Sequence, residues 1–154
     1  MTTANPPIQI AIVGLGNWGR NHVRVYATLN ECRIRFLYDI DPQSLQAQLS
    51  QFPYLKAAGS YEQIVEDPQV QSIVIAAGAR EHYPLALAAL RAGKDVFVEK
   101  PMTLTVEDGE ELCETAERQG RLIQVGHLLL FHPAVQYLKT LIDRGELGDV
   151  HYIY

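Results

Sequence analysis

Short apolar runs alternate with stretches of helical periodicity along the whole chain, and this alternation most constrains the fold. The pattern predicts strands at 8–14, 33–39, 72–77, 95–99 and 122–126, and helices at 18–30, 41–52, 61–67, 81–93, 105–120 and 133–145. Strict alternation favours a parallel sheet with right-handed crossovers. A closed eightfold barrel needs about 250 residues, and the chain has 154. We therefore expect an α/β doubly wound parallel sheet.

Charge and composition narrow the partners to small molecules. The net charge is −5 and no basic run occurs, which argues against nucleic acid and anionic membranes. No apolar run is long enough to cross a bilayer, and the start, MTTANPP, lacks the features of a signal peptide. Cys32 and Cys113 show no metal-ligand spacing, so we expect no metal site and a cytoplasmic protein.

The segment GLGNWG follows the first expected strand and opens the first expected helix. It matches the GxGxxG pattern, which is weak alone but informative in this context. Gly14 would allow the tight turn, Gly16 would leave room for a pyrophosphate, and Gly19 would let helix and strand pack closely. The first-turn amides, including those of Asn17 and Trp18, would face the anion. The segment predicts dinucleotide binding in a sheet of the Rossmann type.

An acidic residue is expected about 20 residues after the glycine pattern, at the end of the second strand. Asp39 lies 39 − 19 = 20 residues after Gly19. Its carboxylate could accept hydrogen bonds from the adenosine ribose and would repel the extra phosphate of NADP, so NAD is favoured over NADP. The alternative is that Asp39 caps the next helix, but Asp41, directly before Pro42, suits that position better.

Other cofactor contacts are expected where strands end, because ligands of open parallel sheets bind beyond the carboxyl ends of the strands. Ala77 and Gly78 are small enough to let a ribose or nicotinamide approach. His82 begins the following helix, and His127 follows the last expected strand. We include all four in the expected cofactor site, whereas His22, on the first helix, is interpreted as a packing or surface residue.

The segment VFVEKPMT ends a strand with two opposite charges and a proline. Pro101 disfavours the helical region for Lys100 and keeps it extended, so the ammonium would be presented at the edge of the sheet. The alternative is a solvated surface lysine. Glu99 and Lys100 would point apart on an extended chain, and either isomer of the Lys100–Pro101 bond is open.

Nearly the whole chain from Ile8 onward resembles the glucose–fructose oxidoreductase / inositol dehydrogenase / rhizopine-catabolism (Gfo/Idh/MocA) family. The similarity is carried by SIVIAAGAREHYPLALAALRAGKDVFVEKPMTLTVEDGEEL, with the pattern H-x-x-x-A-x-x-A-L-x-A-G-K-x-V-x-x-E-K-P from His82 to Pro101. It continues through VGH…FHPAVQYLKTLIDRGELGDV. The chain departs from the family pattern at Ala77-Gly78, where Thr-Pro is common, and at Leu130, where Arg is common.

The resemblance implies an N-terminal NAD(P)-binding domain of an oxidoreductase that acts on a sugar, cyclitol or sugar nucleotide. It implies that Lys100 assists proton transfer as the catalytic residue and that Glu99 contacts the nicotinamide ribose. A second, α+β domain would supply substrate contacts and the interface of a homo-oligomer. The segment GHLLLFHP is most similar to members that act on UDP-N-acetyl-hexosamines, and this is the substrate class we expect.

We expect three parts: a flexible tail at 1–7, a dinucleotide-binding domain at 8–132, and a linking helix and first strand of a C-terminal substrate domain at 133–154. The segment 148–154 resembles the beginning of a strand of that missing domain, so the 154-residue chain alone would be inactive. Two alternatives share these residues: a sensor or regulator that binds NAD without turnover, and an NAD-dependent glycosidase.

Overall fold

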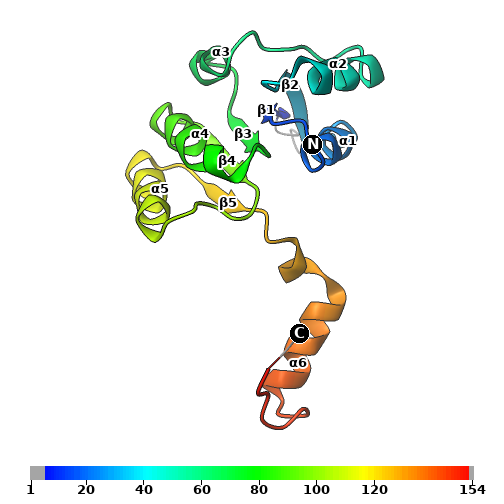
Figure 1. Cartoon of the computed structure of the whole chain (residues 1–154), viewed down its shortest axis with the longest axis vertical. Helices are drawn as coiled ribbons and strands as arrows, with labels where there is room; N and C mark the ends of the chain where they lie inside the picture. The colour runs from blue at the N-terminus through cyan, green and yellow to red at the C-terminus, as the bar shows by residue number, and fades with distance from the viewer. Residues whose placement is uncertain (1–5, 153–154) are drawn as a thin grey trace, which may run out of the picture.

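The computed structural model describes residues 6–152, which form a five-stranded parallel sheet flanked by helices (Figure 1). The strand order is β2-β1-β3-β4-β5. The strands are β1 (Ile8–Val13), β2 (Cys32–Tyr38), β3 (Ser72–Ile75), β4 (Asp95–Val98) and β5 (Ile123–Val125). The helices are α1 (Gly19–Tyr26), α2 (Pro42–Gln51), α3 (Tyr61–Glu66), α4 (Ala79–Arg91), α5 (Val106–Gln119) and α6 (Pro133–Asp143). The α/β doubly wound parallel sheet is therefore confirmed.

Helices cover both faces of the sheet, and alternate residues of β1 show why. Ala11 and Val13 point to one face and pack with buried side chains of α3, α4 and α5. Ile10 and Ile12 point to the other face, where they pack with residues of α1 and α2. Because the strand is covered on both faces, the four residues from Ile10 to Val13 are all buried and all apolar instead of alternating with polar residues. Figure 1 shows α4 and α5 on one side of the sheet and α1 on the other.

Side-chain caps fix where several helices begin. Asp41 accepts hydrogen bonds from the backbone of α2, as expected from its position before Pro42. Thr105 accepts from the amide of Asp108 at the start of α5, and His132 accepts from the amide of Ala134 at the start of α6. Such caps satisfy amides that have no partner within the helix. The helix starts were therefore readable from local sequence.

The amino end of the sheet is held together by buried polar contacts. Lys94 is 7% exposed, and its Nζ donates to the carbonyl oxygens of Asp67 at 2.7 Å and Val70 at 2.8 Å. Burial lowers the pKa of the Lys94 ammonium, although the charge of Asp67 opposes this. Arg35, at a bulge of β2 against β1, donates to Asp67 at 2.8 Å. These contacts lie at the end of the sheet opposite to the expected site.

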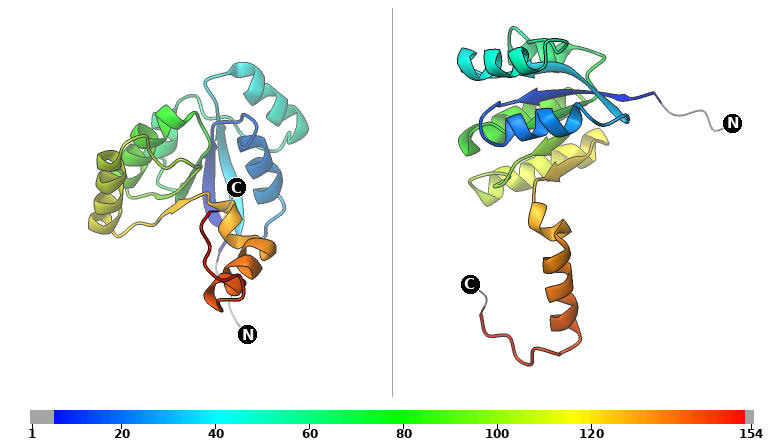
Figure 2. Two further views of the ribbon diagram at one scale, coloured as in Figure 1. Left: turned by 60° about the horizontal axis from the view of Figure 1, so that its bottom comes forward. Right: turned by 90° about the vertical axis from the view of Figure 1, so that its right-hand side faces the viewer.

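The C-terminal segment leaves the layered part of the molecule. Residues 128–131 form a short 3-10 helix and α6 follows, with no buried residue in either. In Figure 2, α6 projects away from the sheet. Residues 148–152 form no strand, and residues 153 and 154 lie outside the described range. The strand expected at 148–154 belongs to the sheet of a second domain and stays a prediction.

Two further expectations concern the ends and the membrane. Five of the seven residues of the expected tail, 1–5, lie outside the described residues, and Pro6 and Pro7 precede β1 without secondary structure. None of the helices formed by residues 6–152 is long and apolar enough to cross a membrane.

Candidate cofactor and catalytic site

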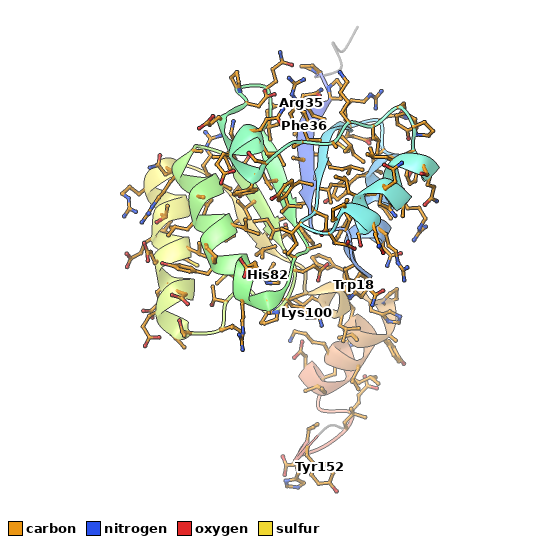
Figure 3. The ribbon with its side chains drawn as sticks, turned by 45° about the horizontal axis from the view of Figure 1, so that its top comes forward. Trp18, Arg35, Phe36, His82, Lys100 and Tyr152 are labelled. Atoms are coloured by element: carbon orange, nitrogen blue, oxygen red, sulfur yellow. The ribbon has the colours of Figure 1, made fainter. Side chains whose placement is uncertain are left out.

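The expected site residues gather at the carboxyl ends of the strands. The glycine loop follows β1, Asp39 follows β2, Ala77 and Gly78 follow β3, and Lys100 follows β4. Figure 3 shows Trp18, His82 and Lys100 at this end of the sheet and Arg35 at the opposite end. His127 follows β5 at the same edge, so the topology brings together residues that are as much as 113 positions apart in the chain, since 127 − 14 = 113.

The three glycines of the loop occupy three different environments. At Gly14, with φ of +84°, a Cβ would lie 2.5 Å from the backbone N of Ala77. At Gly19 a Cβ would lie 1.8 Å from the carbonyl oxygen of Gly14, which excludes any side chain. At Gly16 a Cβ would meet nothing within 4 Å. Two glycines are thus required by packing, whereas Gly16 borders open space.

The amides of Gly16, Asn17 and Trp18 have no acceptor among the described residues. They stand at the start of α1, where the helix dipole favours negative charge. The Asn17 side chain is turned aside, because its Oδ1 accepts from Arg20 at 3.0 Å. Three free donors beside the open space at Gly16 fit a pyrophosphate.

Asp39 connects the glycine loop to the end of β2. One carboxylate oxygen accepts from the backbone N of Leu15, and the other accepts from the backbone N of Asp41 at 2.8 Å. Asp39 is half-buried. A carboxylate offers about four acceptor positions, so acceptor capacity remains for the hydroxyl groups of a ribose. Asp39 does not cap α2, because the capping side chain is that of Asp41.

His82, on α4, holds two of these segments together. Its ring is 1% exposed, with Nε2 at 3.0 Å from the carbonyl oxygen of Ala77 and Nδ1 at 2.7 Å from that of Pro101. Both ring nitrogens are therefore engaged with the backbone. This arrangement favours a positioning role for His82 over the direct cofactor contact expected from sequence.

Lys100 is exposed at the end of β4, and its Nζ has no ion-pair or hydrogen-bond partner among residues 6–152. The Lys100–Pro101 peptide bond is cis. Lys100 makes no ion pair with Glu99, in agreement with the expectation that their side chains point apart. The ammonium is thus exposed at the carboxyl ends of the strands.

Glu99 is 4% exposed and is directed into the protein. Its Oε1 lies 2.9 Å from Nε2 of His22 on α1, and its Oε2 accepts a long hydrogen bond of 3.3 Å from the amide of Lys100. A Cβ at Gly126, after β5, would lie 3.0 Å from Oε2. The ribose contact expected for Glu99 is not open in this arrangement, because the carboxylate is enclosed by His22, Lys100 and Gly126.

His127 is exposed directly after Gly126, in a backbone conformation of φ −82° and ψ 67° that turns the chain toward the 3-10 helix. Its backbone N donates to the carbonyl oxygen of Val125 at 2.8 Å. The side chain is exposed at the end of β5, and its contact with a cofactor stays a prediction.

Sequence reasoning missed His22 and Gly126. The interpretation of His22 as a packing or surface residue was incomplete, because its ring packs against Phe97 at 5.2 Å and also pairs with Glu99. Its place one helical turn after Gly19, on a helix that must face the sheet, was the available signal. Gly126 gave a signal only as a glycine at a strand end.

The site defines a class of protein: an α/β domain with a glycine loop, free helix-terminal amides, an acid after the second strand and a lysine at the cleft edge, as in dinucleotide-binding domains of oxidoreductases. Residues 8–127 match the oxidoreductase family with an NAD-binding Rossmann fold, Gfo/Idh/MocA. The chain belongs to this family. The expected recognition and the expected cofactor, NAD, are thereby confirmed at the level of the family.

Similar proteins include two curated dehydrogenases and one solved structure. The inositol 2-dehydrogenase of Pseudomonas fluorescens is 32% identical over 145 residues, which are 92% of this chain and 43% of that protein. The 1-carboxy-3-chloro-3,4-dihydroxycyclohexa-1,5-diene dehydrogenase of Comamonas testosteroni is 33% identical, covering 96% of this chain and 37% of that protein. The scyllo-inositol dehydrogenase of Lactobacillus casei was solved with NAD(H) and scyllo-inositol. Its structure has a TM-score of 0.82 and is 28% identical in sequence, and the match covers 93% of this chain and 43% of that chain.

The chain thus spans less than half the length of these relatives. The relatives named above give no support to the expectation of a UDP-N-acetyl-hexosamine substrate, since two of them are inositol dehydrogenases. Their bound or named substrates are small cyclic molecules.

Proposed function

We propose that this chain is the NAD-binding part of a dehydrogenase that oxidises a ring hydroxyl of a small polyol, with cyclitols as the leading substrate class. The observation that carries the proposal is the set of free amides at Gly16, Asn17 and Trp18 beside open space, at the same sheet edge as Lys100. The inositol dehydrogenases among the similar proteins support a polyhydroxylated ring as substrate.

Different residues would bind the two ends of NAD, the adenosine and pyrophosphate end and the nicotinamide end. The free amides at the start of α1 would hold the pyrophosphate, and Asp39 would bind the adenosine ribose and select NAD over NADP. The small residues Ala77 and Gly78, with His127, would border the nicotinamide end. NAD supplies the hydride acceptor when it is bound.

Lys100 would take part in moving the proton of the substrate hydroxyl. Its Nζ is exposed at the carboxyl ends of the strands and could serve as the general acid–base group that exchanges this proton. The exposure of Lys100 without an internal partner favours a dehydrogenase over a sensor that binds NAD without turnover. The substrate contacts and the interface between subunits would belong to a second domain, which residues 133–154 would introduce.

Cofactor binding can be measured on the chain itself, because Trp18 is its single tryptophan and lies 45% exposed in the glycine loop. Adding NAD should change the Trp18 emission in a saturable way, and NADH should receive energy from the indole. Asp39→Ala should weaken NAD roughly tenfold and reduce the preference for NAD over NADP, as expected for the loss of hydrogen bonds to a charged acceptor. Glu114→Ala, an exposed acid on α5, is the matched control.

An unchanged emission up to millimolar NAD would overturn the binding proposal. The catalytic assignment is tested separately in a protein that carries this chain together with a substrate domain. There Lys100→Met should abolish inositol oxidation while NAD affinity is retained. Full turnover by Lys100→Met would contradict the assigned proton transfer.

A further inference from the structure

The geometry points to His22 as a positioning residue that couples the phosphate end of the cofactor cleft to its catalytic end, acting through Glu99. His22 lies on α1, three residues after Gly19, and α1 begins at the glycine loop. Its Nε2 is 2.9 Å from Oε1 of Glu99, which directly precedes Lys100. A single contact therefore joins the helix that faces the pyrophosphate to the turn that presents the lysine.

The pair is built into the protein interior, unlike the exposed ion pairs of the surface. The His22 and Glu99 side chains are 13% and 6% exposed, compared with 74% and 57% for the Lys139–Asp143 pair. The His22 ring packs against two aromatic rings, with ring centroids 5.2 Å from that of Phe97 and 6.0 Å from that of Tyr26. A buried carboxylate without its partner is costly, so Glu99 depends on His22 for its orientation.

Glu99 transmits this constraint to two neighbouring strand ends. Oε2 accepts from the amide of Lys100 at 3.3 Å, and the Glu99 carboxylate fills the space that a side chain at Gly126 would need. If Glu99 moved, both the Lys100 turn and the Gly126 turn would lose their contact surface. The ends of β4 and β5 are thus set by a residue of α1.

The positioning part of the inference can be tested without cofactor, by the backbone amide resonances of Lys100 and Gly126 in the 154-residue chain. His22→Phe keeps an aromatic ring against Phe97 but removes the bond to Glu99, and both resonances should move. His22→Gln places an amide nitrogen near the position of Nε2 and should restore them. Arg24→Ala, an exposed residue of the same helix, should leave them unchanged.

Unmoved Lys100 and Gly126 resonances in His22→Phe would overturn the inference. If His22→Phe fails to fold, His22→Asn provides the same comparison, because its shorter amide does not reach Glu99 while the side chain stays polar. A purely structural role for His22 would lower stability without the specific rescue by His22→Gln.

The coupling to the cofactor rests on the proposed NAD site and is tested by a double-mutant cycle on NAD affinity. His22→Phe should weaken NAD binding roughly tenfold in the native background and much less in a Glu99→Gln background, because the two residues act through one contact. Equal losses in both backgrounds would refute action through Glu99. If the unmodified chain does not bind NAD, the proposed function fails, and the amide resonances alone decide the positioning.

Discussion

At the scale of single residues, the glycine loop shows why one sequence pattern contains different physical requirements. No other residue fits at Gly14 or Gly19, because a Cβ there would collide with backbone atoms. Gly16 instead faces open space. The pattern GxGxxG marks all three positions equally. Only the contacts distinguish the two glycines that the fold requires from Gly16, whose open space we propose the ligand uses.

Gly16→Ala should separate folding from binding. Because a Cβ at this position meets no protein atom, the free energy of unfolding should change by no more than about 1 kcal/mol. NAD affinity should fall roughly tenfold or more, because the methyl group would occupy the space needed by the pyrophosphate. Chemical denaturation and Trp18 fluorescence measure the two effects.

Glu114→Ala, an exposed residue of α5, serves again as the control for both measurements. It should change neither quantity appreciably. A Gly16→Ala variant that is strongly destabilised, or that binds NAD as well as the native chain, would contradict the assignment of open space to the ligand.

At the scale of elements, helix caps and strand composition made most boundaries predictable. The expected helix at 105–120 is observed as α5, Val106–Gln119, with Thr105 as its cap and Gly120 in the left-handed conformation at its end. The helix expected at 18–30 is shorter in the structure, where α1 ends at Tyr26. No glycine or other capping residue in the sequence marks that end, so the pattern overestimated its length. Local signals thus set boundaries where a side chain or a glycine completes the backbone hydrogen bonds.

Thr105→Val should destabilise the chain by about 1 kcal/mol, because the amide of Asp108 loses its side-chain acceptor. Thr105→Ser keeps the hydroxyl group and should retain most of the stability. Urea unfolding followed by circular dichroism measures the difference. Equal stability of the valine and serine variants would show that the cap contributes nothing.

The contact between Arg35 and Asp67 predicts an acid-dependent contribution to stability. Burial alone would raise the pKa of the Asp67 carboxyl, but hydrogen bonds from Arg35 and the Gln69 amide, with the charges of Arg35 and Lys94, lower the pKa below 3.8. A carboxyl whose pKa is lowered by folding stabilises the protein above its unfolded pKa, and this stabilisation is lost as pH falls through the folded value.

Asp67→Asn should therefore be less stable than the native chain at neutral pH, and the difference should shrink below about pH 4. Unfolding free energies measured across this range provide the test. Arg35→Met should show the same trend, because it removes the partner that lowers the pKa. A difference that stays constant with pH would contradict the assignment.

At the scale of the whole molecule, the chain consists of a packed sheet domain and an extended C-terminal segment. Side chains such as Leu112 on α5 are fully buried, whereas Leu129 on the 3-10 helix is 69% exposed. The apolar run at 128–131 is exposed throughout. The second domain that we propose above would cover this run.

Leu112→Ala should cost about 2–5 kcal/mol of unfolding free energy in this chain, whereas Leu129→Ala should cost less than about 1 kcal/mol. Thermal or urea unfolding of the two variants provides the comparison. A similar cost for both would show that the 3-10 helix docks onto the sheet, in contrast to its extended position here (Figure 2).

The sequence by itself determined the order of strands and helices, the parallel sheet, the glycine loop and the place of Asp39, because each depends on local composition or on a fixed spacing. Only the tertiary structure decided which expected site residues are exposed and which are held by other parts of the protein. His82 is buried between two carbonyl groups, and Glu99 pairs with His22, 77 residues away in the chain. Such contacts depend on how α1 and α4 pack against the sheet, and no local pattern specifies the direction of a side chain across that packing.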